Sequence, residues 1–157
     1  MAKLVQVLRD LALLIARVSL GVILIAHGYR RWRFQGIASQ IAYLRTFATP
    51  YAEIAAWGGT ILELAGGLFL VVGALTPLAA AAVVAEQVIV ICYTNWYKSI
   101  YLLDRRGAYL GGYEYSVTLA VLALLLVVFG AGRLSIDQLF RGSPHETDAD
   151  YDERSPA

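Results

Sequence analysis

Residues 54–97 read IAAWGGTILELAGGLFLVVGALTPLAAAAVVAEQVIVICYTNWY, and this stretch decides the fold. It holds two apolar runs of about 20 residues each, the length that an α-helix needs to cross a bilayer. Thr76 and Pro77 separate the runs, and proline is tolerated at the start of a helix because the first N–H groups have no intrahelical partner. The stretch therefore predicts two spanning helices, residues 54–75 and 78–97, that form a tight antiparallel hairpin.

The composition of the whole chain is also that of a membrane protein. Of its 157 residues, 59% are hydrophobic and 16% are charged, whereas a soluble domain carries about 25% charged residues. Two further apolar runs, residues 11–28 and 115–132, bring the predicted spans to four. A formal net charge of +1 and the lack of a basic stretch with interleaved aromatic residues argue against nucleic acid as a partner. We expect an all-α transmembrane four-helix bundle in a lipid bilayer.

Two polar segments complete the predicted organisation. Residues 29–53 are too polar to span, but their apolar side chains recur at helical spacing, which indicates an interfacial amphipathic helix between the first two spans. These side chains are Ile37, Ile41, Leu44 and Phe47. Residues 143–157 are acidic and almost without apolar side chains, so we expect a disordered tail. The prediction is one transmembrane domain over residues 1–142, followed by this tail.

Four ionisable residues fall inside the apolar runs: Arg17, His27, Glu63 and Glu86. A charged group deep in a bilayer is costly and is a functional hypothesis by default. With a rise of about 1.5 Å per residue and alternating helix directions, Arg17, Glu63 and Glu86 fall in the same half of the membrane. We therefore predict an intramembrane charge cluster of these three residues. Two carboxylates facing one cation favour a shared, exchangeable proton, and a structural clamp that fixes helix register is the alternative.

A second polar layer is predicted nearer the other surface. The same arithmetic places His27 level with Asn95 and close to Glu114, where the fourth span begins. Together with Tyr115 these residues form a candidate quinone or ligand layer, because their side chains offer hydrogen-bond donors and acceptors to a carbonyl. A structural hydrogen bond is the alternative for His27. No metal site is expected, and the spacing identifies no residue with a catalytic role.

Several motifs occur in an order that resembles the DoxX family of small four-helix membrane proteins. They are the run from Arg17 through Gly21 to His27 and Gly28, GTILELAGGLFLVVGALTPLAA at residues 59–80, GGYEY at 111–115 and GAGRLSID at 130–137. The similarity covers residues 9–137. Arg17, His27, Glu63 and Glu114 match family positions, whereas Glu86 rests on the depth argument alone.

The resemblance implies a multi-pass protein of a prokaryotic cytoplasmic membrane, in a superfamily that contains the membrane subunit of thiosulfate:quinone oxidoreductase. It implies a membrane subunit or anchor of a redox complex. The expected partner is a soluble oxidoreductase or another membrane-complex subunit, and the expected cofactor is a quinone, with none bound covalently. Two other classes stay open. One is a non-enzymatic protein that handles a lipid or small molecule, as a homo-oligomer that encloses a path, and the other is a structural membrane scaffold.

Overall fold

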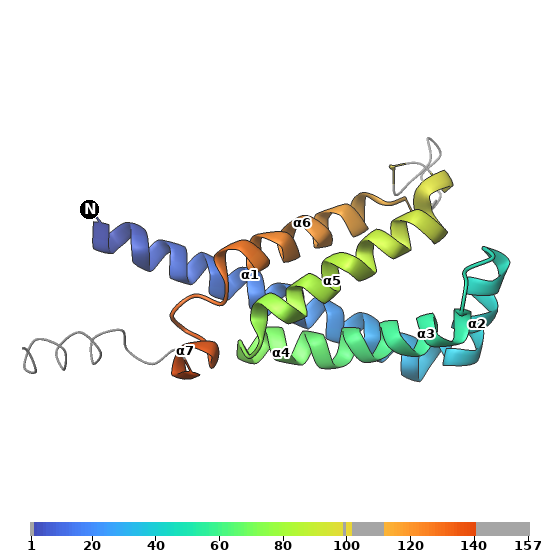
Figure 1. Cartoon of the computed structure of the whole chain (residues 1–157), viewed down its shortest axis with the longest axis horizontal. Helices are drawn as coiled ribbons and strands as arrows, with labels where there is room; N and C mark the ends of the chain where they lie inside the picture. The colour runs from blue at the N-terminus through green and yellow to red at the C-terminus, as the bar shows by residue number, and fades with distance from the viewer. Residues whose placement is uncertain (1, 99, 102–111, 141–157) are drawn as a thin grey trace, which may run out of the picture.

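A computed structural model of the protein describes residues 2–98, 100–101 and 112–140, and those residues form helices and no strand (Figure 1). The all-α prediction is confirmed for this part of the chain. The tail predicted to be disordered, residues 143–157, lies outside it, as does the boundary predicted at residue 142.

The first helix is longer than predicted at both ends. Helix α1 covers Ala2–Arg30 and continues into a π-helical segment, η1, at Arg31–Gln35. Gly36, with φ of 79°, then breaks the helix and redirects the chain into α2, Ile37–Thr46. Helix α2 lies where the amphipathic helix is predicted, and its Leu44 is buried against Ala52 and Ala56 of the next helix. The chain therefore turns back beside the end of α1.

The predicted hairpin is present. Helix α3, Ala52–Ile61, continues through a π-helical segment, η2, at Leu62–Gly66 into α4, Gly67–Val72. After a short turn, α5 covers Thr76–Val90 and continues through the π-helical segment η3, Ile91–Asn95, into a 3₁₀ turn, η4, at Trp96–Lys98. Pro77 stands in the first turn of α5, as the sequence predicts.

The last described part of the chain contains α6, Glu114–Phe129, and the short α7, Asp137–Phe140. Helix α7 closes the hairpin turn, because the Asp137 carboxylate accepts hydrogen bonds from the N–H groups of Leu75 at 2.6 Å and Thr76 at 2.9 Å. These two groups are among the first N–H groups of α5, which lack intrahelical partners.

Three helices are long and apolar enough to cross a membrane: Lys3–Gln35, Ala52–Val72 and Thr76–Asn95. Helix α6 is apolar but has 16 residues, which is a length of about 24 Å against a hydrocarbon core of about 30 Å. The fourth span and the interfacial position of α2 remain predictions.

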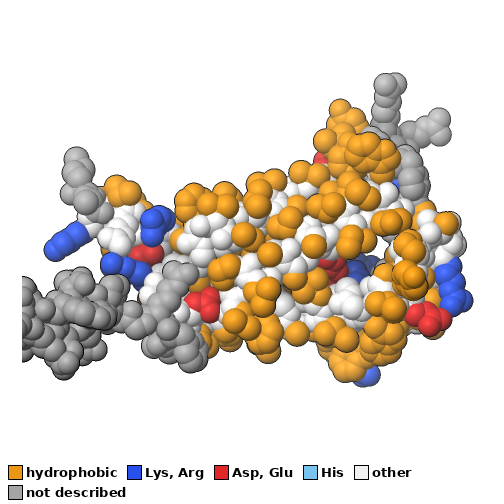
Figure 2. Space-filling model, viewed as in Figure 1, with side chains coloured by type: hydrophobic (Ala, Val, Ile, Leu, Met, Phe, Trp, Pro, Cys, Tyr) orange, Lys and Arg blue, Asp and Glu red, His pale blue; other side chains and the backbone are white. Residues whose placement is uncertain are grey.

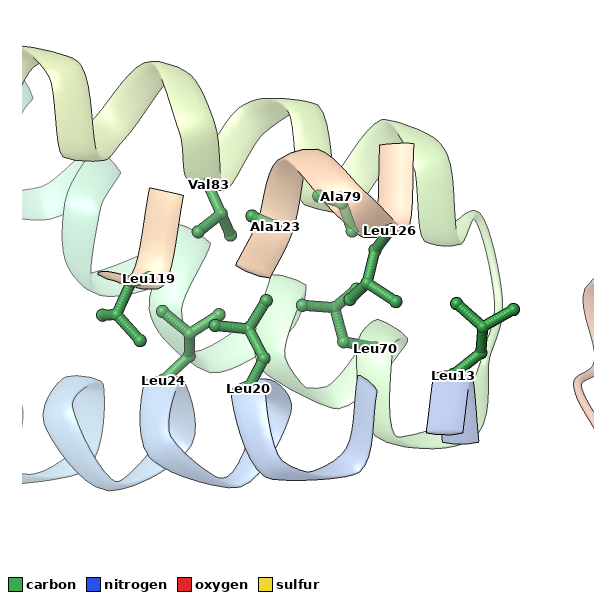
Figure 3. Close-up of a cluster of buried hydrophobic side chains, with 10 residues drawn as sticks. Leu13, Leu20, Leu24, Leu70, Ala79, Val83, Leu119, Ala123 and Leu126 are labelled. Carbon is green, nitrogen blue, oxygen red and sulfur yellow. The ribbon is translucent and has the colours of Figure 1, made fainter. Parts of the chain in front are cut away.

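Helices α1, α4, α5 and α6 share one buried apolar cluster (Figure 3). The leucines of α1 and the leucines of α6 point towards one another, Leu70 of α4 lies beside Leu126, and Ala79 and Val83 of α5 complete the cluster. Its labelled members are Leu13, Leu20, Leu24, Leu70, Ala79, Val83, Leu119, Ala123 and Leu126. Small side chains on α5 let α6 approach closely, the usual way in which helices associate in lipid.

Helices α1 and α4 meet backbone to backbone at two glycines. A Cβ atom added to Gly21 would lie 2.6 Å from the Gly67 carbonyl oxygen, and one added to Gly67 would lie 2.8 Å from the Gly21 carbonyl oxygen. This contact tolerates no side chain on either residue. It sets an antiparallel register in which Gly28 lies against Glu63, since a Cβ on Gly28 would be 3.0 Å from the Glu63 Cβ.

Replacement of Gly21 by valine is expected to lower the free energy of unfolding by about 1–3 kcal/mol, because overpacking forces the two helices apart. The measurement is denaturant-induced unfolding in detergent, followed by circular dichroism. Ala26→Val is the matched control, because Ala26 is an exposed residue of the same helix. Equal stability of the two variants would contradict the close contact.

Candidate functional site

An ion pair between two helices is the centre of the candidate site. The Arg31 Nη2 atom donates a hydrogen bond to Glu63 Oε1 at 2.9 Å, and the two side chains are 18% and 6% exposed. Arg31 is the first residue of η1 and Glu63 is the second residue of η2. The register set by the glycine contact brings them together.

Glu86 of α5 adds a second carboxylate to this pair. A Cβ atom on Gly59 would lie 3.0 Å from Arg31 Nη1 and 3.0 Å from Glu86 Oε1. The missing side chain of Gly59 therefore leaves room for both groups to approach the same point on α3. Arg31, Glu63 and Glu86 together are called the charge cluster below.

Three buried polar atoms in and beside the charge cluster have no hydrogen-bond partner among the described residues. They are Glu63 Oε2, Glu86 Oε2 and Thr49 Oγ1. Buried polar atoms are nearly always hydrogen-bonded, and each exception requires an explanation. Both carboxylates thus retain an oxygen that can accept a hydrogen bond from a bound molecule.

A pocket of 340 Å³ opens beside the charge cluster, within the size range of small-molecule sites, about 300–1,000 Å³. Arg31 and Glu86 line it together with the polar residues Gln40, Thr49 and Thr94. The other lining residues are mostly apolar: Leu44, Ala55, Gly58, Gly59, Leu62, Ala82, Ala85, Ile89, Val90 and Tyr93. Figure 2 shows an acidic and a basic patch side by side within the otherwise apolar face between α5 and α3. This cavity is called the Arg31 pocket below.

All three π-helical segments of the described chain contribute to the Arg31 pocket. Arg31 comes from η1, Leu62 from η2, and Tyr93 and Thr94 from η3. A π-helical turn inside an α-helix is rare and often marks a functional site. Their convergence therefore distinguishes this pocket from the packed core.

The sequence profile of the DoxX family matches residues 12–96, more than half of the chain. The chain belongs to the DoxX family. No curated protein and no solved structure matches it. The matched segment includes the DoxX protein's charge cluster and every lining residue of the Arg31 pocket, and it ends before α6. Family membership and the apolar helices identify a multi-pass membrane protein.

The structure does not bring Arg17 to the carboxylates of the DoxX charge cluster, and Arg31 takes the position predicted for Arg17. The Arg17 guanidinium is buried at the other end of α4, where it donates hydrogen bonds to the carbonyl oxygens of Ala131 at 2.8 Å and Leu134 at 2.7 Å. It lies against Gly73, ten residues and about 15 Å along the helix from Glu63. Arg17 thus holds the connection after α6.

A longer helical stripe could have identified Arg31 from the sequence. Gly21, Leu24, Gly28 and Arg31 follow one another at steps of three and four residues, so they share one face of a helix. The predicted span ends at residue 28, which leaves Arg31 in a connection. In the structure the helix continues through η1, and Arg31 stays on the face that contacts Glu63.

Two residues of the predicted second polar layer, His27 and Tyr115, are in contact. His27 stacks on Tyr115 with ring centroids 5.3 Å apart, and His27 Nε2 is hydrogen-bonded to the Tyr115 hydroxyl at 2.9 Å. Asn95 is half-buried at the end of η3, and Glu114 begins α6, where its N–H donates to the Ile100 carbonyl. The quinone role of these residues remains a prediction. The Arg31 pocket is lined by other residues.

A double-mutant cycle tests the pairing in the charge cluster of this DoxX protein. Arg31→Gln and Glu63→Gln are expected to show a coupling energy of about 1–3 kcal/mol, because each single change leaves a buried polar partner unsatisfied. The measurement is the free energy of unfolding in detergent for the wild type, both single variants and the double variant.

The matched control is the same cycle with Arg17→Gln in place of Arg31→Gln. Since Arg17 and Glu63 share no partner, their effects should add to within about 0.5 kcal/mol. Strong coupling of Glu63 to Arg17, with none to Arg31, would restore the pairing predicted from the sequence.

Proposed function

We propose that this DoxX protein binds the head group of a quinone in the Arg31 pocket and serves as the quinone-interacting membrane subunit of a redox complex. The observation that carries the proposal is the pocket itself. An apolar cavity on membrane-spanning helices is lined by Arg31 and Glu86, and Glu86 Oε2 has no hydrogen-bond partner among the described residues. Glu63 does not line the cavity and binds Arg31 from behind it.

The chemistry of the charge cluster suits both redox forms of a quinone. A quinone carbonyl accepts hydrogen bonds, and the guanidinium of Arg31 is a donor with no acceptor function. A hydroquinone hydroxyl donates, and Glu63 Oε2 and Glu86 Oε2 are buried acceptors. Reduction of one quinone to hydroquinone takes up two electrons and two protons. Glu86 supplies one proton to the carbonyl oxygen beside it and is reprotonated from the water side, and water supplies the second proton to the other carbonyl oxygen.

The electrons have to come from a partner protein. The sequence carries no motif for a bound redox cofactor, and the protein part of such an enzyme provides binding, orientation and proton transfer while the cofactor carries the electrons. A soluble oxidoreductase docked on the membrane subunit is the proposed donor.

The unpartnered carboxylate oxygens favour a ligand site over a purely structural clamp. A clamp is stable when its buried charges are paired and the remaining lone pairs are hydrogen-bonded. Here Glu63 is paired through one oxygen only, and Glu86 Oε2 is buried without a partner among the described residues. A hydroquinone bound in the Arg31 pocket would satisfy Glu86 Oε2, because Glu86 lines the pocket.

Replacement of Glu86 by glutamine is expected to weaken binding of a short-tailed hydroquinone, decylubiquinol, by about tenfold or more, because a charge-assisted hydrogen bond is lost. Binding of the oxidised form, decylubiquinone, should change less, since the amide of glutamine can donate to its carbonyl. The measurement is isothermal titration of both forms to the purified protein in detergent.

Glu53→Gln is the matched control for this experiment. Glu53 forms an exposed ion pair with Arg45 at 2.8 Å, with side chains 68% and 63% exposed, and it is not a lining residue of the pocket. Equal affinity of wild type and Glu86→Gln for the hydroquinone would remove Glu86 from the site. Failure of both redox forms to bind the wild type would overturn the proposed function.

The redox-complex part is tested by native mass spectrometry of the gently solubilised protein from its own host, with identification of small molecules in the same sample. A soluble oxidoreductase and a quinone are expected to accompany the protein. Recovery of the protein with lipid alone would overturn the subunit role and favour a lipid-handling function.

A further inference from the structure

A second cavity adjoins the Arg31 pocket on an exposed apolar face of the helical hairpin. It is a groove of 350 Å³ between the continuous helix α3–η2–α4 and helix α5. Small residues lie along it, and large apolar side chains that are 42% to 66% exposed border it. The small residues are Gly58, Ala65, Gly66, Ala79 and Ala82, and the large ones are Ile61, Leu62, Phe69, Leu75 and Leu78, of which Leu62 is half-buried. This cavity is called the lateral groove.

The lateral groove borders the Arg31 pocket along a shared wall. Gly58, Leu62 and Ala82 line both cavities. A molecule in the two cavities would therefore have one end at Arg31 and Glu86 and the other end among apolar side chains near the start of α5. Every residue that lines the groove is apolar. The combined cavity thus has the polarity of an amphipathic ligand with one polar head and one apolar tail.

The dimensions of the groove favour a single hydrocarbon chain over a helix. It extends along α5 from Ala82 to Leu75, which is about 10 Å along the helix axis. Its volume is 350 Å³, whereas a 10 Å length of an α-helix that is about 10–12 Å wide with its side chains fills about 800–1,100 Å³. A helix of a second copy or of a partner would not fit inside the groove.

We propose that the lateral groove holds the apolar tail of the ligand whose head group occupies the Arg31 pocket, and that the ligand enters sideways from the bilayer between α4 and α5. This inference rests on the proposed function, because it assumes a head group in the pocket. It adds a selectivity for lipid-soluble quinones with an alkyl or isoprenoid tail over water-soluble quinones of the same head group.

The test fills the groove without changing the pocket. Ala65 lines the lateral groove only, so Ala65→Phe should block the tail and leave the head-group site intact. The probes are decylubiquinone and 2,3-dimethoxy-5-methyl-1,4-benzoquinone, which has the same head and no tail. Affinities are measured in detergent. The concentration of decylubiquinone is expressed as its mole fraction in the micelle, because its apolar tail partitions into detergent micelles even when no protein is present.

Ala65→Phe is expected to weaken decylubiquinone binding by about tenfold and to change binding of the tail-less probe by less than about twofold. Ala65→Leu should give a smaller loss of the same kind, and it keeps the test decisive if the phenylalanine variant unfolds. Ala81→Phe is the matched control, because Ala81 is an exposed residue of α5 that lines neither cavity.

The outcomes separate the two proposals. If neither probe binds the wild type, the proposed function fails. If both probes bind and the Ala65 variants affect neither, or affect both equally, the head-group site stands and the tail assignment is overturned. Selective loss of decylubiquinone from the folded Ala65 variants, with no loss from Ala81→Phe, supports the lateral groove as the tail site.

Discussion

The backbone contact between Gly21 and Gly67 is the constraint on which the rest of the site depends. Lipid tails are as apolar as leucine, so helices in a membrane gain little from hydrophobic burial and associate mainly through close packing and polar contacts. The two glycines let α1 and α4 approach until a Cβ on either would collide with the opposite backbone. This fixes the register of the two helices, and Arg31 consequently lies opposite Glu63.

The buried Arg17 and the half-buried Arg31 have different physical surroundings. Arg17 donates hydrogen bonds to backbone carbonyl oxygens of the connection after α6. These acceptors are uncharged and do not take up or release protons. Arg31 faces carboxylates beside a pocket. The first arrangement joins chain segments that are far apart in sequence, whereas the second keeps a charged group available to a ligand. Burial of an arginine alone therefore does not identify a functional site, and the chemistry of its acceptors does.

The Arg31 pocket has charged lining residues and the lateral groove has only apolar ones. This combination suits an amphipathic ligand better than a water-soluble one. The charged end lies where η1, α3 and α5 meet, and the apolar groove runs between the continuous helix α3–η2–α4 and α5. In the proposed binding mode, a ligand dissolved in the bilayer would reach Arg31 and Glu86 by this route without crossing a water layer. The π-helical segments contribute to the same place, because their wider turns alter which side chains face the pocket.

The sequence by itself determined the helical class, the hairpin at Thr76 and Pro77, and the membership of Glu63 and Glu86 in a polar site. These follow from local rules, namely run length, the position of proline, and the cost of a carboxylate among apolar residues. The sequence also placed His27 near Tyr115, since both stand at predicted helix ends on the same side. It did not identify Arg31 as the ion-pair partner of Glu63.

Only the tertiary structure decided between Arg17 and Arg31. Both arginines follow the same glycine stripe, and the choice depends on how far α1 slides along α4, which is set by the packing of Gly21 on Gly67 and not by composition. The Arg31 pocket and the lateral groove could likewise not be predicted from the sequence. Each is lined in part by small residues, and a small residue leaves a cavity only if no large side chain of another helix fills the space opposite it. The type and length of a helix are local properties, whereas register and cavities are properties of pairs of helices.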